Sequence, residues 1–327
     1  MSLSVIVVTY NSREEIAVFL QTLSNLVRKF QINVETRITD NNSEDKTQDF
    51  LTGEANKWKE LNLSLTFNSK NFGLSSELNK QIARCSGEMV LICNPDIMFT
   101  EDMVQLLRYS ETYPGYGIVP ELLNYDGSTQ KIVYRRFPTL SRILLSYTFT
   151  GRLLSRTIAK KIFDDYSYVG HEFCSPVDLI EQPGGGCLLF QKRTLKRLDP
   201  FFDPRFPVLW NDVDMAVRAR AAGIRFLIAP DVKLYHGHAH SFKKLSLEHK
   251  MMLFYSSQGM LGFIEKWRLH PRIVRAILLF DSTASVVATF ASHFLGKQTR
   301  RSRALGRSQG LRKALGLATL RFRCSLW

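Results

Sequence analysis

Residues 4–16 read SVIVVTYNSREEI, an apolar run that passes through a polar turn into an amphipathic pattern. The run Ser4–Tyr10 is rich in β-branched residues, as is typical of a strand buried on both faces. Ser12, with Glu15 three residues later, predicts a capping box at the start of a helix. Apolar residues then recur at helical spacing as far as Phe30, so this stretch predicts a buried strand followed by a helix.

The alternation of strand and helix continues along the first third of the chain. Strand-like runs occupy residues 32–39, 63–67 and 88–93, and helical patterns occupy residues 75–84 and a segment from about residue 101. This order predicts an α/β fold with helices on both faces of the sheet. Since the carboxyl ends of parallel strands share one edge, we expect the polar segments that follow the strands to converge there. These segments are residues 9–11, 40–42, 68–73 and 94–96.

The second half of the chain is less regular but still contains clear elements. Residues 177–193 predict a strand, a glycine turn and a second strand. Residues 210–223 predict a helix with acids at its start and arginines near its end, as the helix dipole favours. Residues 224–230 and 232–240 are strand-like, and the pattern is helical beyond residue 246.

The net charge of the 327-residue chain is +14, and the excess is concentrated near the C-terminus. Residues 266–327 contain 13 lysines and arginines against one acid, Asp281. Because these cations alternate with apolar residues and no nucleic-acid motif accompanies them, we expect contact with an anionic membrane surface and no nucleic-acid partner. Basic residues of the irregular segment 121–175 could face the same surface: Arg135, Arg136, Arg142, Arg152, Arg156, Lys160 and Lys161. The alternative is a solvated basic packing element.

Cysteine usage and terminal composition bear on location. The five cysteines form no CxxC pair, so neither a disulfide framework nor a zinc site is expected and a reducing cytosol fits best. The first residues enter a strand without a basic segment, which predicts no signal peptide. Residues 276–295 contain too many polar groups for a clear membrane span. We therefore expect a cytoplasmic protein that lies peripherally on the inner face of the cell membrane.

Seven short motifs occur in a characteristic order: VIVVTYNS, ITDNNSED, NFGLSSELNKQI, NPD, PGGGCLLF, FFDPRFPVLWNDVDMAVRARAAG and LYHGHAHS. In this order they resemble a family 2 glycosyltransferase with the GT-A fold, over roughly residues 1–241. Within that family the motifs resemble those of the bacterial rhamnosyltransferase-like enzymes of polysaccharide assembly. The resemblance implies a Rossmann-like mixed sheet flanked by helices. It divides the chain into a glycosyltransferase domain (residues 1–244, with a nucleotide-binding half at 1–100 and an acceptor half at 101–244) and a basic helical extension (245–327).

The resemblance also implies which residues bind the nucleotide-sugar donor. These are Thr9, Tyr10, Asn11, Asp40, Asn71, Gly73, Asn79, Asn94, Asp96, Gly185 and Gly186. The carboxylate of Asp40 could accept a hydrogen bond from a pyrimidine N–H. The alternative for Asp40 is a turn followed by a helix cap, and for Gly184–Gly186 it is a hairpin turn.

A divalent cation, Mg²⁺ or Mn²⁺, would help to hold the donor diphosphate. The family often has an Asp-x-Asp pattern here, and this chain has Asn94 and Asp96. The resemblance gives Asp96 and His236 as the metal ligands. The alternatives are a capping role for Asp96 before the next helix and a surface-loop position for His236; His238 and His240 are left without a role.

The resemblance gives Asp212 as the general base that takes the proton of the acceptor hydroxyl. The family carries Glu-Asp at this helix start, whereas this chain has Asn211 and Asp212, with Asp214 as a supporting group. A single displacement with this base inverts the anomeric centre. The alternative is that both acids only complement the helix dipole.

Together these features predict an inverting glycosyltransferase that moves a sugar from a nucleotide-sugar donor, with dTDP-rhamnose as one candidate. The acceptor would be a saccharide or a lipid-linked sugar in the synthesis of cell-surface polysaccharide such as lipopolysaccharide. A non-catalytic nucleotide-sugar or polysaccharide-binding subunit is the alternative, because asparagine replaces one acid of each motif. A dinucleotide-binding oxidoreductase is disfavoured, since the turn TYNSRE after the first strand contains no GxGxxG.

Overall fold

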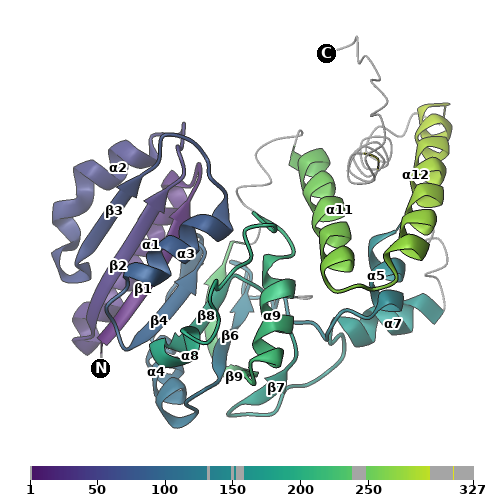
Figure 1. Cartoon of the computed structure of the whole chain (residues 1–327). Helices are drawn as coiled ribbons and strands as arrows, with labels where there is room; N and C mark the ends of the chain where they lie inside the picture. Colours follow the sequence, from purple (N-terminus) through teal and green to yellow (C-terminus); the bar gives the residue numbers. More distant parts are fainter. Residues whose placement is uncertain are drawn as a thin grey trace. The chain divides into compact units, whose positions relative to one another are not determined.

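The computed structural model describes residues 2–130, 133–148, 151, 158–237, 248–294 and 312 (Figure 1). It divides into two compact units, one of Met1–Phe137 with Tyr166–Ser241 and one of Pro138–Asp165 with Phe242–Trp327. The nucleotide-binding and acceptor roles given to parts of the chain stay predictions. His238, His240, Arg152, Arg156 and nearly all of the basic residues beyond residue 295 lie outside the described residues.

The first unit is built on a nine-stranded mixed sheet in the order β3-β2-β1-β4-β8-β6-β9-β5, with β7 also paired to β9 (Figure 1). Its strands are β1 (Ser2–Thr9), β2 (Asn33–Asp40), β3 (Leu63–Phe67), β4 (Met89–Cys93), β5 (Ile97–Met98), β6 (Gly117–Leu123), β7 (Asp178–Ile180), β8 (Cys187–Gln191) and β9 (Phe226–His236). Strands β3, β2, β1 and β4 are parallel. Strand β8 runs antiparallel to both β4 and β6, whereas β6 and β9 are parallel to each other. The predicted α/β class with a mixed sheet is confirmed.

Helices cover both faces of this sheet, as the alternating pattern predicts. Alternate residues of β1 point into two separate cores, since Val5 and Val7 belong to one and Ile6 and Val8 to the other. Helices α1 (Arg13–Phe30) and α4 (Met103–Thr112) contribute to the first core. Helices α3 (Leu74–Arg84) and α9 (Asn211–Ala221) contribute to the second. The central strands are therefore buried on both sides.

Several local predictions differ from the structure. Ser12 stands at the N-cap position of α1, but its hydroxyl donates to the carbonyl oxygen of Tyr10, so the predicted capping box is wrong. The segment predicted as two strands at 224–230 and 232–240 is one strand, β9, with a register shift where it pairs with β6. Short elements between β2 and β3, namely α2 (Thr47–Glu54) and the 3-10 helix η1 (Ala55–Leu61), were not predicted. Neither was β6.

The described part of the second unit is helical. It contains α5 (Leu140–Tyr147), α7 (Ile158–Tyr166), α11 (Glu248–Lys266) and α12 (Pro271–Phe294), together with the isolated helical residues Gly151 and Arg312. Arg142 of α5 pairs with Asp165 of α7 at 2.6 Å. Helix α12 buries Val274 and Leu278 but exposes Ile273 and Phe280. Among the described residues, none of the helices combines the length and apolar character that crossing a membrane requires.

Candidate functional site

The candidate site lies along one edge of the sheet in the first unit. The pairing directions bring the carboxyl ends of β1, β2, β3, β4, β6 and β9 to this edge, together with the amino ends of β8 and β5. Each predicted segment follows or precedes one of these strand ends. The predicted convergence is confirmed, and it collects side chains that are as far apart in sequence as Thr9 and His236.

Asp40, at the end of β2, is fully buried and makes four hydrogen bonds within the protein. Its Oδ1 accepts from the hydroxyls of Thr9 at 2.9 Å and Ser43 at 2.5 Å. Its Oδ2 accepts from the backbone N–H of Ser43 at 2.9 Å and from Gln48 Nε2 at 2.6 Å. A carboxylate has about four acceptor sites, so these bonds use its capacity. The bond from the Ser43 N–H to Oδ2 closes a turn at residues 40–43, as the alternative prediction for Asp40 expects.

Most of the other predicted donor-binding residues on this side of the site bond to the backbone of their own or of a neighbouring loop. Asn11 accepts from the N–H of Glu44 at 2.8 Å, and Asn71 accepts from the N–H of Gly73 at 2.9 Å. Asn79 forms a two-way pair with the backbone of Phe202, donating to its oxygen at 2.7 Å and accepting from its N–H at 2.9 Å. Tyr10, by contrast, exposes 45% of its surface. Side chains in this part of the site shape the loops, and Tyr10 faces solvent.

Gly73 joins this part of the site to the second half of the chain. Its φ of +85° lies in the left-handed region, and a Cβ there would come within 3.1 Å of Pro207 Cβ. The N–H groups of Leu74 and Ser75, at the start of α3, donate to the carbonyl oxygen of Pro207 at 2.9 and 3.3 Å. The left-handed backbone and the contact with Pro207 both require glycine at position 73. The bonds to Pro207 fix the loop before α9 against α3.

At the other end of the edge, Asp96 and His236 lie together. Asp96 directly precedes β5, and His236 is the last residue of β9, where it is opposite Ile97. Asp96 Oδ1 lies 3.3 Å from His236 Nε2, and Asn94 Nδ2 lies 3.1 Å from the same nitrogen. Asp96 precedes the two-residue strand β5 and caps no helix, and His236 is buried at the end of β9. Both alternative readings, a capping Asp96 and a surface-loop His236, are wrong.

Two residues near this pair were not predicted from the sequence. Gln130 bonds both the backbone oxygen and the ring nitrogen Nδ1 of His236, at 2.7 and 3.0 Å. The hydroxyl of Tyr125 donates to the backbone oxygen of Asp96 at 2.9 Å, and burial raises the pKa of Tyr125 to about 12. Both lie in the irregular stretch after β6, where the sequence shows no periodic pattern. The signal that could have found them is the Asn-Tyr-Asp-Gly turn at residues 124–127, which folds the chain back toward β6.

Consecutive glycines link the Asp96–His236 pair to Asp212. A Cβ on Gly186 would lie 3.3 Å from His236 Cε1, and a Cβ on Gly185 would lie 3.8 Å from Asp212 Cβ. The strands on either side, β7 and β8, pair with different partners, so the glycines do not form the turn of a hairpin. The structure therefore brings the predicted metal ligands and the predicted base to adjoining positions.

Asp212 lies in the first turn of α9 and is half-buried. Its Oδ1 accepts from the N–H of Val213 at 2.9 Å. Desolvation by burial raises the pKa of the Asp212 carboxyl above its ordinary value, while Arg135 and backbone N–H groups, including that of Gly185, act in the opposite direction. A carboxyl with a raised pKa is a stronger base when ionised, which suits proton abstraction near neutral pH.

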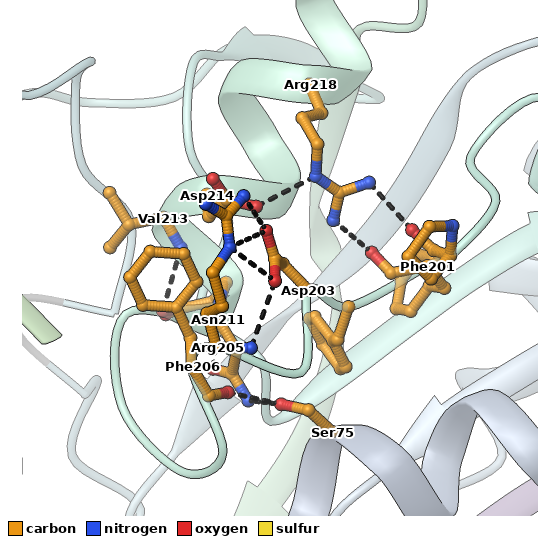
Figure 2. A network of polar contacts seen from close by, with 12 residues as sticks. Ser75, Phe201, Asp203, Arg205, Phe206, Asn211, Val213, Asp214 and Arg218 are labelled. Atoms are coloured by element: carbon orange, nitrogen blue, oxygen red, sulfur yellow. Dashed lines mark hydrogen bonds and ion pairs between the residues drawn. The ribbon is translucent and has the colours of Figure 1, made fainter. Parts of the chain in front are cut away.

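Asp214 has a different environment although it is two residues away (Figure 2). It is fully buried and pairs with Arg218 at 2.8 Å, and Arg218 also donates to the backbone oxygens of Pro200 and Phe201. Asp203 binds Arg205 through two oxygens in the same loop. These contacts fix the loop before α9 to the helix, so Asp214 supports the position of Asp212.

Arg135, which acts on Asp212, forms a backbone bridge with Gln182. Each donates its backbone N–H to the other's carbonyl oxygen at 2.9 Å, which puts their side chains on the same side of the bridge. Arg135 is near enough to Asp212 to lower its pKa. Gln182 is almost completely buried, and neither Oε1 nor Nε2 of its side chain has a hydrogen-bond partner within the described part of the chain.

Comparison with known proteins also indicates a glycosyltransferase. A family model described as glycosyl transferase family 2 matches residues 4–168. The chain is 26% identical over 253 residues to an N-acetylglucosaminyl-diphospho-decaprenol L-rhamnosyltransferase of Mycobacterium tuberculosis, with 73% of this chain and 77% of that protein covered.

Solved structures with a similar fold include two glycosyltransferases. A mannosyltransferase from Pyrobaculum calidifontis, in complex with GDP-Man and Mn²⁺, matches with a TM-score of 0.52 at 18% identity, over 96% of this chain and 86% of that one. GalNAc-T7, with UDP, GalNAc and Mn²⁺, matches with a TM-score of 0.52 at 15% identity over 72% of this chain. The chain spans only 43% of the length of GalNAc-T7. These likenesses confirm the predicted GT-A fold.

Proposed function

The chain belongs to glycosyl transferase family 2 and is a glycosyltransferase, and from this premise we propose that it moves a sugar from a nucleotide-sugar donor to a lipid-linked acceptor with inversion. The observation that carries the proposal is the adjoining position of the Asp96–His236 pair and Asp212, on either side of Gly185 and Gly186. One group can support a leaving diphosphate while the other takes a proton from the attacking alcohol.

The donor diphosphate would lie beside Asp96 and His236. Asp96 is only 9% exposed, and within the described residues His236 is the one polar partner of its carboxylate. A carboxylate this buried needs a counter-charge, so the pair fits a divalent cation. Bound there, Mg²⁺ or Mn²⁺ would neutralise charge on the leaving nucleotide. The described residues hold no group of three metal-binding side chains, so phosphate oxygens and water would complete the coordination, as Mg²⁺ commonly requires.

The nucleotide would lie at the β1–β2 end of the same edge. Tyr10 offers an exposed ring, and the loops at this end are held through Thr9, Asn11, Asp40 and Asn71. Gly73 and Asn79 hold the loop before α9 against α3. Asp40 has no spare acceptor site, so direct contact with a base would require one of its present donors to move. We propose that Asp40 supports the donor site mainly by fixing the Ser43 turn.

Asp212 would act as the base. The acceptor hydroxyl gives its proton to the Asp212 carboxylate while its oxygen bonds to the anomeric carbon of the donor sugar. The bond from that carbon to the diphosphate oxygen breaks, and its electron pair leaves with the nucleotide. Because attack comes from the side opposite the nucleotide, the anomeric configuration inverts. Arg135 keeps part of the Asp212 population ionised by lowering its pKa.

The donor sugar and the acceptor are suggested by the relative from M. tuberculosis. Its name describes transfer of L-rhamnose to a lipid diphosphate that carries N-acetylglucosamine. We propose a similar pair for this chain, a dTDP-activated deoxyhexose such as dTDP-rhamnose and a polyprenyl-diphosphate-linked sugar. A lipid-linked acceptor places the enzyme at a membrane surface.

The exposed side of α12 supports such a peripheral position. It carries Arg272, and Arg275 in an ion pair with Glu265, among the exposed apolar residues Ile273, Leu279 and Phe280. Cations mixed with apolar side chains bind anionic interfaces. We expect the protein to sediment with anionic phospholipid vesicles, less so at high salt, and the double variant Ile273→Ser, Phe280→Ser to sediment less. Equal sedimentation of wild type and variant would contradict this.

The central experiment measures nucleotide release from a panel of nucleotide sugars, each with a polyprenyl-diphosphate-linked N-acetylglucosamine acceptor and Mn²⁺ or Mg²⁺. We expect acceptor-dependent release of dTDP from dTDP-rhamnose and a product of inverted configuration. If nucleotide is released from a different nucleotide sugar, the proposed donor would change but the proposed reaction class would not. Donor binding without release for any pair would favour the non-catalytic binding subunit.

A further inference from the structure

Gln130 contacts His236 at two points. Its side-chain nitrogen Nε2 donates to the backbone oxygen of His236 at 2.7 Å. Its side-chain oxygen Oε1 lies 3.0 Å from the ring nitrogen Nδ1. Both residues are buried, at 5% and 6% exposure. Gln130 itself is held by its backbone N–H, which donates to the carbonyl oxygen of Leu122 at 2.9 Å.

These two contacts determine which ring nitrogen carries the proton. A carbonyl oxygen only accepts hydrogen bonds, so the amide of Gln130 must turn its NH₂ group toward the His236 backbone. Its oxygen then faces Nδ1 and can only accept, so Nδ1 must be the protonated nitrogen. In a neutral ring the lone pair is therefore on Nε2.

Asn94, beside Nε2, agrees with this assignment, whereas the carboxylate of Asp96, which only accepts, is compatible with an unprotonated Nε2 when a cation lies between the two. Asn94 Nδ2, a donor, lies 3.1 Å from Nε2, which can accept only if it is unprotonated. Asp96 Oδ1 lies 3.3 Å from the same nitrogen. Gln130 and Asn94 come from opposite sides of the ring, and both favour the same tautomer. The Nε2 lone pair is thus turned toward the carboxylate of Asp96.

We propose that Gln130 is a positioning residue that fixes His236 in the Nδ1–H tautomer and so presents the Nε2 lone pair beside Asp96. The inference rests on the proposed function, in which that lone pair meets a divalent cation. Groups that orient a metal-binding histidine in this way typically change metal affinity or activity by about 10–100-fold when removed. The turn at residues 124–127 indicates that the chain folds back here, but no sequence motif indicates the contact of Gln130 with His236.

A purely structural role for Gln130 would have a different signature. Gln130 joins the turn after β6 to the end of β9, so its loss will lower stability in either case. Gln81 is a matched control, because it is equally buried and its amide also bonds at both ends, to Thr39 and Arg37. Gln81 lies in α3 and contacts none of the proposed metal ligands.

The test is the imidazole NMR spectrum of metal-free protein labelled with ¹⁵N-histidine, at mildly alkaline pH. The chain has seven histidines, so His236 is assigned from the signals that disappear in His236→Asn. Wild type should show His236 with a protonated Nδ1 and an unprotonated Nε2. Gln130→Leu should lose this pattern. Gln81→Leu, which leaves both contacts of Gln130 in place, should keep it.

A second measurement titrates Mn²⁺ into each protein in the presence of dTDP. Gln130→Leu should bind Mn²⁺ about 10–100-fold more weakly than wild type, with Gln81→Leu closer to wild type. A protonated Nε2 in wild-type His236, or an unchanged tautomer in folded Gln130→Leu, would overturn the proposal. Failure of wild type to bind Mn²⁺ with the expected tautomer present would instead contradict the metal role in the proposed function.

Discussion

The two ends of the sheet edge use carboxylates in opposite ways. At the β1–β2 end, Asp40 is buried and all of its acceptor capacity is used by Thr9, Ser43 and Gln48. At the β4–β9 end, Asp96 is almost as buried, yet within the described residues its carboxylate meets only His236. The carboxylate of Asp40 stabilises the loop that contains Ser43. The carboxylate of Asp96 is left with unused acceptor capacity, which is the arrangement expected where a ligand completes the site.

Asp212 should give the largest effect among the variants that test this comparison. Asp212→Asn keeps the side-chain shape but cannot take a proton, so kcat should fall by about 10²–10⁴-fold. Because burial raises the pKa of Asp212, its ionised form costs stability above that pKa, and the neutral variant should melt at the same or a higher temperature. Nucleotide-release kinetics and thermal unfolding near neutral pH measure both quantities.

Asp214→Asn is the matched control for that variant. It weakens the buried ion pair with Arg218, and losing a partner of such a pair costs about 3–5 kcal/mol. Its melting temperature should therefore fall, whereas kcat of the folded protein should change far less than in Asp212→Asn. Near-normal turnover by Asp212→Asn would contradict the assignment of the base.

Asp96 should give the next largest effect. Asp96→Asn removes the charge that would hold the cation, so the gain in donor affinity on adding Mn²⁺ should shrink by about 10–100-fold. Calorimetry with dTDP-rhamnose, with and without Mn²⁺, measures this gain in wild type and variant. An equal donor affinity in wild type with and without metal would remove the metal role altogether.

Asp40 should affect stability more than binding. In Asp40→Asn one carboxylate oxygen becomes an NH₂ group that faces donors, and each buried group left without a partner costs about 1–3 kcal/mol. Chemical unfolding measures this loss, and the donor KM of the folded fraction should change little. The opposite result, unchanged stability with a large rise in donor KM, would show that Asp40 contacts the nucleotide directly.

The contrast between Asp40 and Asp96 also shows which features could be predicted from the sequence alone and which could not. The buried β-branched runs and the helical stripe ending at Phe30 specify the sheet and its carboxyl edge, because burial patterns are local in sequence. Thr9, Asp40, Asp96 and His236 follow or end strands, so their convergence was predictable. Whether the acceptor capacity of a carboxylate is used was not predictable, since the partners of Asp40, and the one partner of Asp96 in the described part of the chain, depend on tertiary contacts. Gln130 was missed because it lies in an irregular segment.

The pH dependence of the reaction tests the surroundings of Asp212. The base works only when ionised, so kcat/KM should fall as pH drops through its pKa, which burial raises above the ordinary carboxyl value. Arg135 opposes that rise, so Arg135→Met should shift the acidic limb of the profile to higher pH. Arg136→Met is the control and should leave the limb in place. An unshifted limb in Arg135→Met would mean that another group sets it.

Gln182 should give the smallest effect and the most direct test of buried polar groups that have no partner within the described residues. Both ends of its buried amide lack partners within the described residues, so burying them costs free energy that nothing in the fold returns. Gln182→Met, of similar shape, should therefore unfold at the same denaturant concentration as wild type or a slightly higher one. Gln81→Met, which loses bonds to Thr39 and Arg37, should unfold at a lower concentration. If Gln182→Met lost as much stability as Gln81→Met, the Gln182 amide would have hydrogen-bond partners in solution. The contrast between satisfied and unsatisfied polar groups would then not extend to Gln182.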